Sequence, residues 1–204
     1  MKLYRQGDAP EFGVVRSHPW TGSATDPASR YYDFKKHPEL ISAVLEDFRP
    51  WSETLAVQSF YRLLAMLNGG DSPLETNDCA FNEPSPNLDS AFGKRLQCSG
   101  RLLILFRDLL RNSERDRVEW LEHQLLQRLA DLDPDFPWTA VGTAIVPTRF
   151  ITLPLSRQAG WQLAIHFFAW GDTPQETIEH FGEIVLCLAK VLPAIATEIN
   201  RLGE

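Results

Sequence analysis

Three side chains in this sequence could act as a nucleophile, a general base or a metal ligand. His166 lies between Ile165 and Phe167, where a neutral imidazole could serve as a general base or as an axial ligand. Cys79 follows two polar residues and Cys98 precedes a Ser-Gly pair, so either thiol could become a nucleophile or a soft ligand if a cation lowered its pKa. We therefore name His166, Cys79 and Cys98 as the candidate catalytic residues. The simpler interpretation is a small buried apolar residue for each cysteine, and a histidine at the sheet surface with a hydrogen bond to a neighbour for His166.

The stretch 161–170 also contains the aromatic side chains that could line a cofactor pocket. Trp161, Phe168 and Trp170 flank His166 in a segment that alternates with a period of two. This alternation predicts a strand, and both of its faces carry enough apolar residues to be at least half buried. His166, Trp161, Phe168 and Trp170 are thus the candidate cofactor-binding residues. The same aromatic residues could also belong to an ordinary core.

Sequence motifs that mark common enzyme classes are absent. The chain has no G-x-G-x-x-G, no Walker loop, no G-x-S-x-G, no H-E-x-x-H and no C-x-x-C. The five histidines are scattered, and no two of them would share one face of a helix, so we expect no metal site. Glu176 and His180 lie four residues apart on a predicted helix. This spacing could form an acid/base unit, but it favours an ordinary exposed contact between the two side chains.

The charge and the apolar content of the chain limit its partners and its location. The chain has 204 residues with 20 Lys and Arg against 27 Asp and Glu, which gives a formal net charge of -7 and argues against a nucleic-acid groove. The longest apolar stretches are far shorter than the roughly 20 residues that span a bilayer, so we expect no membrane partner. The first residues are charged and do not resemble a signal peptide, and the three cysteines suit free thiols; together these features predict a cytoplasmic protein.

Helix signals recur along the chain. A helix opens at Pro38 and stops at Pro50, and a second runs from a Ser52 N-cap to Leu67. A third covers 113–132, with Ser113 as its N-cap. The fourth begins after an N-cap at Thr173 and runs toward residue 203, with Pro193 expected to kink or divide it.

Strand signals fall between these helices. The segment 74–81 is a short candidate strand, whereas 82–93 is predicted to be a loop because it is rich in Pro, Asn and Ser. The stretch 101–110 fits both a buried strand and a helix, and we choose a strand for its first half. The segment 139–155 is one bent strand or two short ones, and 161–170 is the last strand.

The order of elements predicts the fold class. We expect a single α+β domain at 38–204, in which an antiparallel sheet of about four strands carries helices on one face, in the order α-α-β-β-α-β-β-α. Residues 1–37 show no sustained period and are predicted to form an irregular arm. Trp20 and Tyr31 favour docking of this arm onto the body, although it could equally be partly disordered.

The order of elements and three local patterns resemble the YqcI/YcgG family, whose better-known members are haem-dependent N-oxygenases. The patterns are Cys79-Ala80-Phe81, the Pro- and Asp-rich turn at 133–138 that leads to Trp138, and the aromatic strand that ends at Trp170 before a helix. The resemblance implies a haem cofactor. The Cys and His residues that follow the family's Trp are missing after Trp138, however, so no haem ligand is carried over.

Two functions from different classes follow from these observations. The first is a small acidic protein that acts by binding a protein or small-molecule partner without a catalytic centre. The alternative is a haem- or other cofactor-dependent, oxygenase-like enzyme with a pocket lined by the strand 161–170. We take the binding function as the leading hypothesis because the motifs of common enzymes are absent. Whether the protein is an enzyme, and its oligomeric state, are left open.

Overall fold

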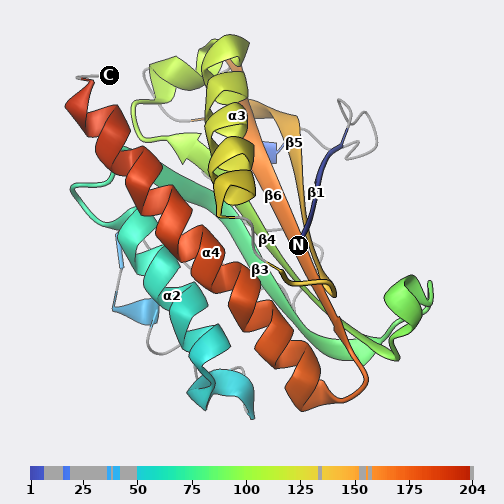
Figure 1. The fold of residues 1–204 in the computed structure, drawn as a ribbon. Helices are drawn as coiled ribbons and strands as arrows, with labels where there is room; N and C mark the ends of the chain where they lie inside the picture. Colours follow the sequence, from blue (N-terminus) through green and yellow to red (C-terminus); the bar gives the residue numbers. More distant parts are fainter. Residues whose placement is uncertain are drawn as a thin grey trace.

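Three long helices lie on one face of a mixed six-stranded sheet in the part of the chain that the structure describes (Figure 1). The structure is a computed structural model, and it describes residues 1–6, 16–18, 36–37, 39–41, 50–132, 135–151, 155 and 158–202. The helices are α2 (Leu55–Asn68), α3 (Arg115–Asp131) and α4 (Pro174–Arg201). The predicted α+β class, with helices on one face of the sheet, is confirmed.

The main strands of the sheet follow the order β1-β5-β6-β4-β3. Neighbouring strands among β3, β4, β6 and β5 are antiparallel. The bounds of these four strands are β3 (Leu74–Pro86), β4 (Leu96–Phe106), β5 (Thr139–Phe150) and β6 (Ala159–Gly171). The strand chosen for the first half of 101–110 is therefore confirmed, and 139–150 forms one strand.

Two short strands near the N-terminus, within the segment 1–37, correct the prediction of a purely antiparallel sheet of about four strands. Strand β1 (Lys2–Arg5) and strand β2 (Arg16–His18) both pair with β5 in parallel, β1 along its first half and β2 at its end. They cover the edge of β5, whose backbone groups would otherwise be exposed. Strands of four and three residues are too short to show a period in the sequence.

Other boundaries also differ from the predictions. Residues 82–86, predicted as loop, continue β3; its prolines are tolerated because β3 lies at the edge of the sheet. The N-cap of α2 is Thr54 rather than Ser52, because residues 51–53 form a 3-10 turn, η3 (Trp51–Glu53), and the Thr54 hydroxyl accepts from the Val57 amide. Of the helix predicted after Pro38, only residues 39–41 lie within the described residues, and Leu40 and Ile41 are helical.

Helices α3 and α4 show how caps and prolines act here. Ser113 belongs to the 3-10 turn η5 (Leu109–Ser113), so it does not cap α3, whose N-cap is Glu114. Thr173 caps α4 as predicted, with its hydroxyl accepting from the Glu176 amide. Pro193 lies inside α4 without dividing it.

The main core lies between the helices and the sheet. Leu163, Ile165 and Phe167 of β6 face the helices and pack into this core, together with Leu102 and Ile104 of β4. Alternate residues of the same strands point to the other side, which we call the second face of the sheet. A small apolar cluster marks the second face: Leu103, Ala144, Val146 and Ala164.

The sheet curls strongly about its second face. His18 of β2 and Glu75 of β3 lie four strand spacings apart in the order of the sheet, a distance of about 19 Å if the sheet were flat. Yet His18 Nε2 lies 2.7 Å from Glu75 Oε1. Phe150 of β5 likewise packs with Leu105 of β4, although β6 lies between these strands. One end of the second face is therefore the inside of a curved sheet.

Candidate functional site

The structure separates the three candidate catalytic residues. His166 lies on the second face, in register with Arg101 of β4 and Gly142 of β5. Cys79 and Cys98 lie on the helix-facing side: Cys98 belongs to the main core, and the partly buried Cys79 packs against it. The sheet therefore stands between the imidazole and both thiols, so they cannot ligate one metal ion or act on one substrate together.

The environment of the two cysteines disfavours thiolate chemistry. Burial, with a further contribution from Asp78, raises the pKa of Cys79 to about 12, and Arg101 opposes this only in part. Burial also raises the pKa of Cys98, whose thiol lies 3.1 Å from the Asn82 carbonyl oxygen and donates to it. A thiol that stays protonated at neutral pH is a poor nucleophile and a poor metal ligand, so both cysteines serve as small core residues.

The four candidate cofactor-binding residues do not line one pocket either. The Trp161 ring packs on the helix-facing side, and the Arg115 guanidinium lies 5.0 Å from its centroid. Phe168 and Trp170 stack on the other side, with centroids 5.9 Å apart. The Trp170 indole N–H donates to Gln97 Oε1 at 3.0 Å, which anchors that ring to β4. A haem group does not fit these residues as a set, because neither the rings nor the candidate ligands converge.

The connection between β3 and β4 carries exposed apolar side chains. This hairpin tip, residues 87–95, extends away from the helices (Figure 1) and contains the 3-10 turn η4 (Ala91–Gly93). Leu88 is 91% exposed and Phe92 is 45% exposed. Large apolar side chains at such a position are unfavourable in water, and they commonly mark contacts with another protein.

The backbone of the hairpin tip is strained and held in place. Ser90 has a φ of 51° and Phe92 a φ of 56°, in the left-handed region that a bulky residue rarely adopts. The Asn87 amide group donates to the carbonyl oxygens of Ala91 and Lys94, both at 2.9 Å. The Phe92 ring packs on Trp170 with centroids 4.7 Å apart. Strain that is maintained by such contacts often occurs at functional positions.

A cluster of rings and charges forms the base of this hairpin. Lys94 Nζ donates to Asp172 at 2.7 Å and to Glu176 at 2.8 Å, and it lies 4.4 Å from the centroid of Trp138. Trp138 stacks on His180, with centroids 5.2 Å apart. We call Phe92, Trp138 and Trp170 with these partners the aromatic corner.

The ion pairs of the aromatic corner shift the pKa values of their members. The hydrogen bonds to Asp172 and Glu176 raise the pKa of Lys94. The hydrogen bond from Lys94, with that from the Asp172 amide, lowers the pKa of Glu176. Because Lys94 is bound by two carboxylates, its cation is already compensated, and the corner offers no free positive charge from this residue.

Sequence reasoning assigned the key residues of this region to other roles. Trp138 is 37% exposed. Leu88 and Phe92 fell in a segment predicted to be a loop. Their signal was present, because two large apolar residues in an otherwise polar loop have no local reason to be there. His180 was expected to form an exposed contact with Glu176, whereas its Nδ1 lies 2.7 Å from the Trp170 carbonyl oxygen.

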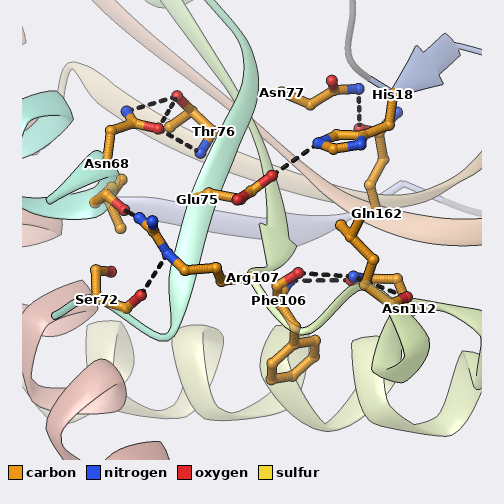
Figure 2. A network of polar contacts seen from close by, with 12 residues as sticks. His18, Asn68, Ser72, Glu75, Thr76, Asn77, Phe106, Arg107, Asn112 and Gln162 are labelled. Atoms are coloured by element: carbon orange, nitrogen blue, oxygen red, sulfur yellow. Dashed lines mark hydrogen bonds and ion pairs between the residues drawn. The ribbon is translucent and has the colours of Figure 1, made fainter. Parts of the chain in front are cut away.

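A second group of polar residues lies on the second face, at the curled end of the sheet. The ring of His18 points from β2 to the carboxyl group of Glu75, and the Asn77 amide donates to Gln162 Oε1 at 3.1 Å (Figure 2). All four side chains are buried. This cluster could not be predicted from the sequence, because its members come from three segments that lie far apart along the chain.

A surface depression of about 330 Å³ lies between η5, α3 and the end of α4, lined in part by Arg111, Arg117 and Trp120. Its arginines form ion pairs with neighbours in sequence, Arg111 with Asp108 and Arg117 with Glu114. The depression is therefore a mixed-charge surface rather than an anion site. Within the described residues no group of three or more His, Cys, Asp or Glu side chains could hold a metal ion.

Comparison with known proteins adds no relative. No family model, no curated protein and no solved structure matches the chain. The resemblance to the YqcI/YcgG family therefore stays a prediction. Among the described helices, none is both long enough and apolar enough to cross a membrane.

Proposed function

We propose that the protein binds another protein through the hairpin tip and the aromatic corner, and that the partner presents a basic and apolar surface. The observation that carries this proposal is the exposure of Leu88 and Phe92 on a hairpin tip whose backbone is held in a strained conformation. Exposure of apolar side chains to water is unfavourable, so their burial by a partner contributes favourable free energy to binding.

The shape of the region favours a protein over a small molecule. Small-molecule sites are concave and enclose most of the ligand surface. The hairpin tip extends outward instead (Figure 1), and Leu88 is almost entirely accessible. An outward tip with aromatic anchors is typical of a surface that inserts into a groove of another protein.

The charge of the region indicates the chemistry of the partner. The segments 82–95 and 172–183 together contain six acidic side chains and two basic ones. Lys94 is bound by two carboxylates, and Arg95 donates to the Asp172 carbonyl oxygen at 2.8 Å. A basic partner surface is therefore favoured, and pairing with a second copy of this acidic region is disfavoured.

Site-specific photo-cross-linking in cells tests this proposal. A photoreactive amino acid replaces Leu88 in one variant and Leu110 in the control. Leu110 is 59% exposed, and it lies in η5, beyond the other end of β4. We expect one protein to cross-link from position 88 and not from position 110.

The partner identified in this way then allows a direct measurement of affinity. Phe92→Ser and Leu88→Ser should each weaken binding by about tenfold or more, and added salt should weaken it further. Cross-links to no specific protein, equal cross-linking from both positions, or cross-links only to a second copy of this chain would contradict the proposal.

A further inference from the structure

The curled end of the second face contains a group of polar atoms that is independent of the hairpin tip. His18 Nδ1, Thr148 Oγ1 and Gln162 Nε2 are buried and have no hydrogen-bond partner in the described part of the chain. The three residues are at most 4% exposed. Buried polar groups in native proteins are nearly always paired with protein, water or a ligand, so three unpaired atoms in one region require an explanation.

The three side chains belong to one surface. In β5, Val146 and Phe150 point to the second face of the sheet. Thr148 lies two residues from each of them, so its side chain points to the same face. Gln162 is in register with Val146. The His18 ring packs edge-on against Phe150, with centroids 5.9 Å apart. The strands β2, β5 and β6 thus bring an imidazole, a hydroxyl and an amide to the inside of the curl.

The bonds that these side chains already make define what each unpaired atom can offer. His18 Nε2 faces the Glu75 carboxyl group at 2.7 Å. In the neutral ring that donates from Nε2 to this carboxyl group, Nδ1 carries an acceptor lone pair. Gln162 Oε1 accepts from Asn77, which orients the amide and leaves its Nε2 hydrogens as donors. The Thr148 hydroxyl can donate or accept.

A ligand for this site must therefore carry both a hydrogen-bond donor and an acceptor. Charge is disfavoured, because the neighbouring apolar cluster of Leu103, Ala144 and Ala164 gives no compensation and Glu75 already supplies one carboxyl group. We propose that His18, Thr148 and Gln162 form a binding site for a small neutral molecule with a primary carboxamide group. Its N–H would bind His18 Nδ1, and its carbonyl oxygen would accept from Gln162 or Thr148.

Titration of the full-length protein with acetamide tests this site. The readout is the nitrogen NMR spectrum of protein labelled with ¹⁵N-histidine, in which the His18 signals are assigned from their loss in His18→Gln. We expect a saturable shift of the His18 Nδ1 signal with acetamide. Acetate, which has the same size but a negative charge, should give no saturable shift.

Matched variants separate a binding site from a general effect on folding. Thr148→Val should weaken acetamide binding by about tenfold, and Thr148→Ser, which restores the hydroxyl, should recover it. Thr143→Val is the control, because Thr143 has a similar buried and unpaired hydroxyl among the described residues but packs on the helix-facing side of β5. It should leave the affinity unchanged.

Three results would overturn the inference: no saturable shift with acetamide up to the highest concentration at which the protein stays folded, equal binding of acetate, or equal loss of affinity in Thr143→Val and Thr148→Val. The first would mean that the cluster holds only water. None of these outcomes bears on cross-linking from position 88, so the site and the proposed protein contact succeed or fail separately.

Discussion

His18 and Glu75 form a buried pair between strands that lie far apart in the sheet, with His18 Nε2 2.7 Å from Glu75 Oε1 and side chains only 5% and 4% exposed. The contact ties the N-terminal strand β2 to the first residues of β3. It closes the curl of the sheet, and it places a carboxyl group next to an imidazole at a buried position. Removal of either partner takes this hydrogen bond away from a buried side chain.

A double-mutant cycle measures this relationship. His18→Phe should lower the free energy of unfolding by about 3 to 5 kcal/mol, because it removes the imidazole from a carboxyl group that stays buried. Addition of Glu75→Leu should recover part of the loss. The exposed pair of His37 and Glu39, whose atoms lie 3.2 Å apart with side chains 58% and 68% exposed, is the control. Its coupling in urea unfolding should be about 1 kcal/mol or less. A similar coupling in both pairs would contradict the structural interpretation.

Gly100 of β4 is predicted to tolerate no side chain. A methyl group at this position would overlap the ring of Phe167, which is fully buried between sheet and helices. Gly100→Ala should therefore cost about 1 to 3 kcal/mol or more in urea unfolding. Gly70→Ala, where nothing lies within 4 Å of the added methyl group, should change stability far less. Equal effects of the two substitutions would show that Phe167 does not pack against Gly100.

Ser90 at the hairpin tip is predicted to store backbone strain that glycine would relieve. Its φ of 51° is costly for a residue with a Cβ atom. Ser90→Gly removes this strain, but it also raises the entropy of the unfolded chain, which opposes folding. The net effect should be an increase of about 0.5 to 1 kcal/mol in the free energy of unfolding. Gly93→Ala, at a φ of 65°, should have the opposite sign. Thermal unfolding provides the measurement, and a destabilised Ser90→Gly protein would mean that the left-handed turn is absent.

Cys79 is predicted to be inert at neutral pH. Burial and Asp78 raise its pKa to about 12, so its thiol should react with iodoacetamide at pH 8 far more slowly in the native protein than in urea. The same shift makes stability depend on pH. The folded state holds the thiol proton more tightly than the unfolded state does. The contribution of Cys79 to the free energy of unfolding is therefore complete below the ordinary thiol pKa, and it is lost as the pH rises toward 12.

Cys79→Ala provides the control for both measurements. Its free energy of unfolding should fall less steeply above about pH 9 than that of the unmodified chain. Rapid alkylation of native Cys79 at pH 8, followed by mass spectrometry of the peptide, would show that the thiol is not buried as described. Such a result would also restore Cys79 as a candidate nucleophile.

Much of the local structure could be predicted from short stretches of sequence. The Thr-Pro-Gln-Glu pattern at Thr173 located the start of α4, because an N-cap hydroxyl and a proline at the first turn act within four residues. The alternation along 161–170 identified β6 and its two buried faces. The η3 turn moved the cap of α2 from Ser52 to Thr54, a difference that depends on how the preceding chain approaches the helix.

The candidate site was harder to predict. Alternation showed that His166 and Phe167 point to opposite sides, but it could not show which side the helices cover. Cys79 and Cys98 have polar neighbours in sequence, but their strands turn both side chains toward the helices, where Cys98 joins the core and Cys79 packs against it. The exposed position of Leu88 depends on how far the β3–β4 hairpin extends beyond the helices.

The sequence by itself determined the α+β class, the strand at 161–170, the cap at Thr173 and the acidic charge, because each depends on neighbours within a few residues or on composition alone. Only the tertiary structure decided the parallel pairing of β1 and β2 with β5, the separation of His166 from the cysteines, and the meeting of His18 with Glu75, 57 residues apart. These features depend on the register between distant strands and on the curl of the sheet. Both are set by packing of the whole core, which no local pattern encodes.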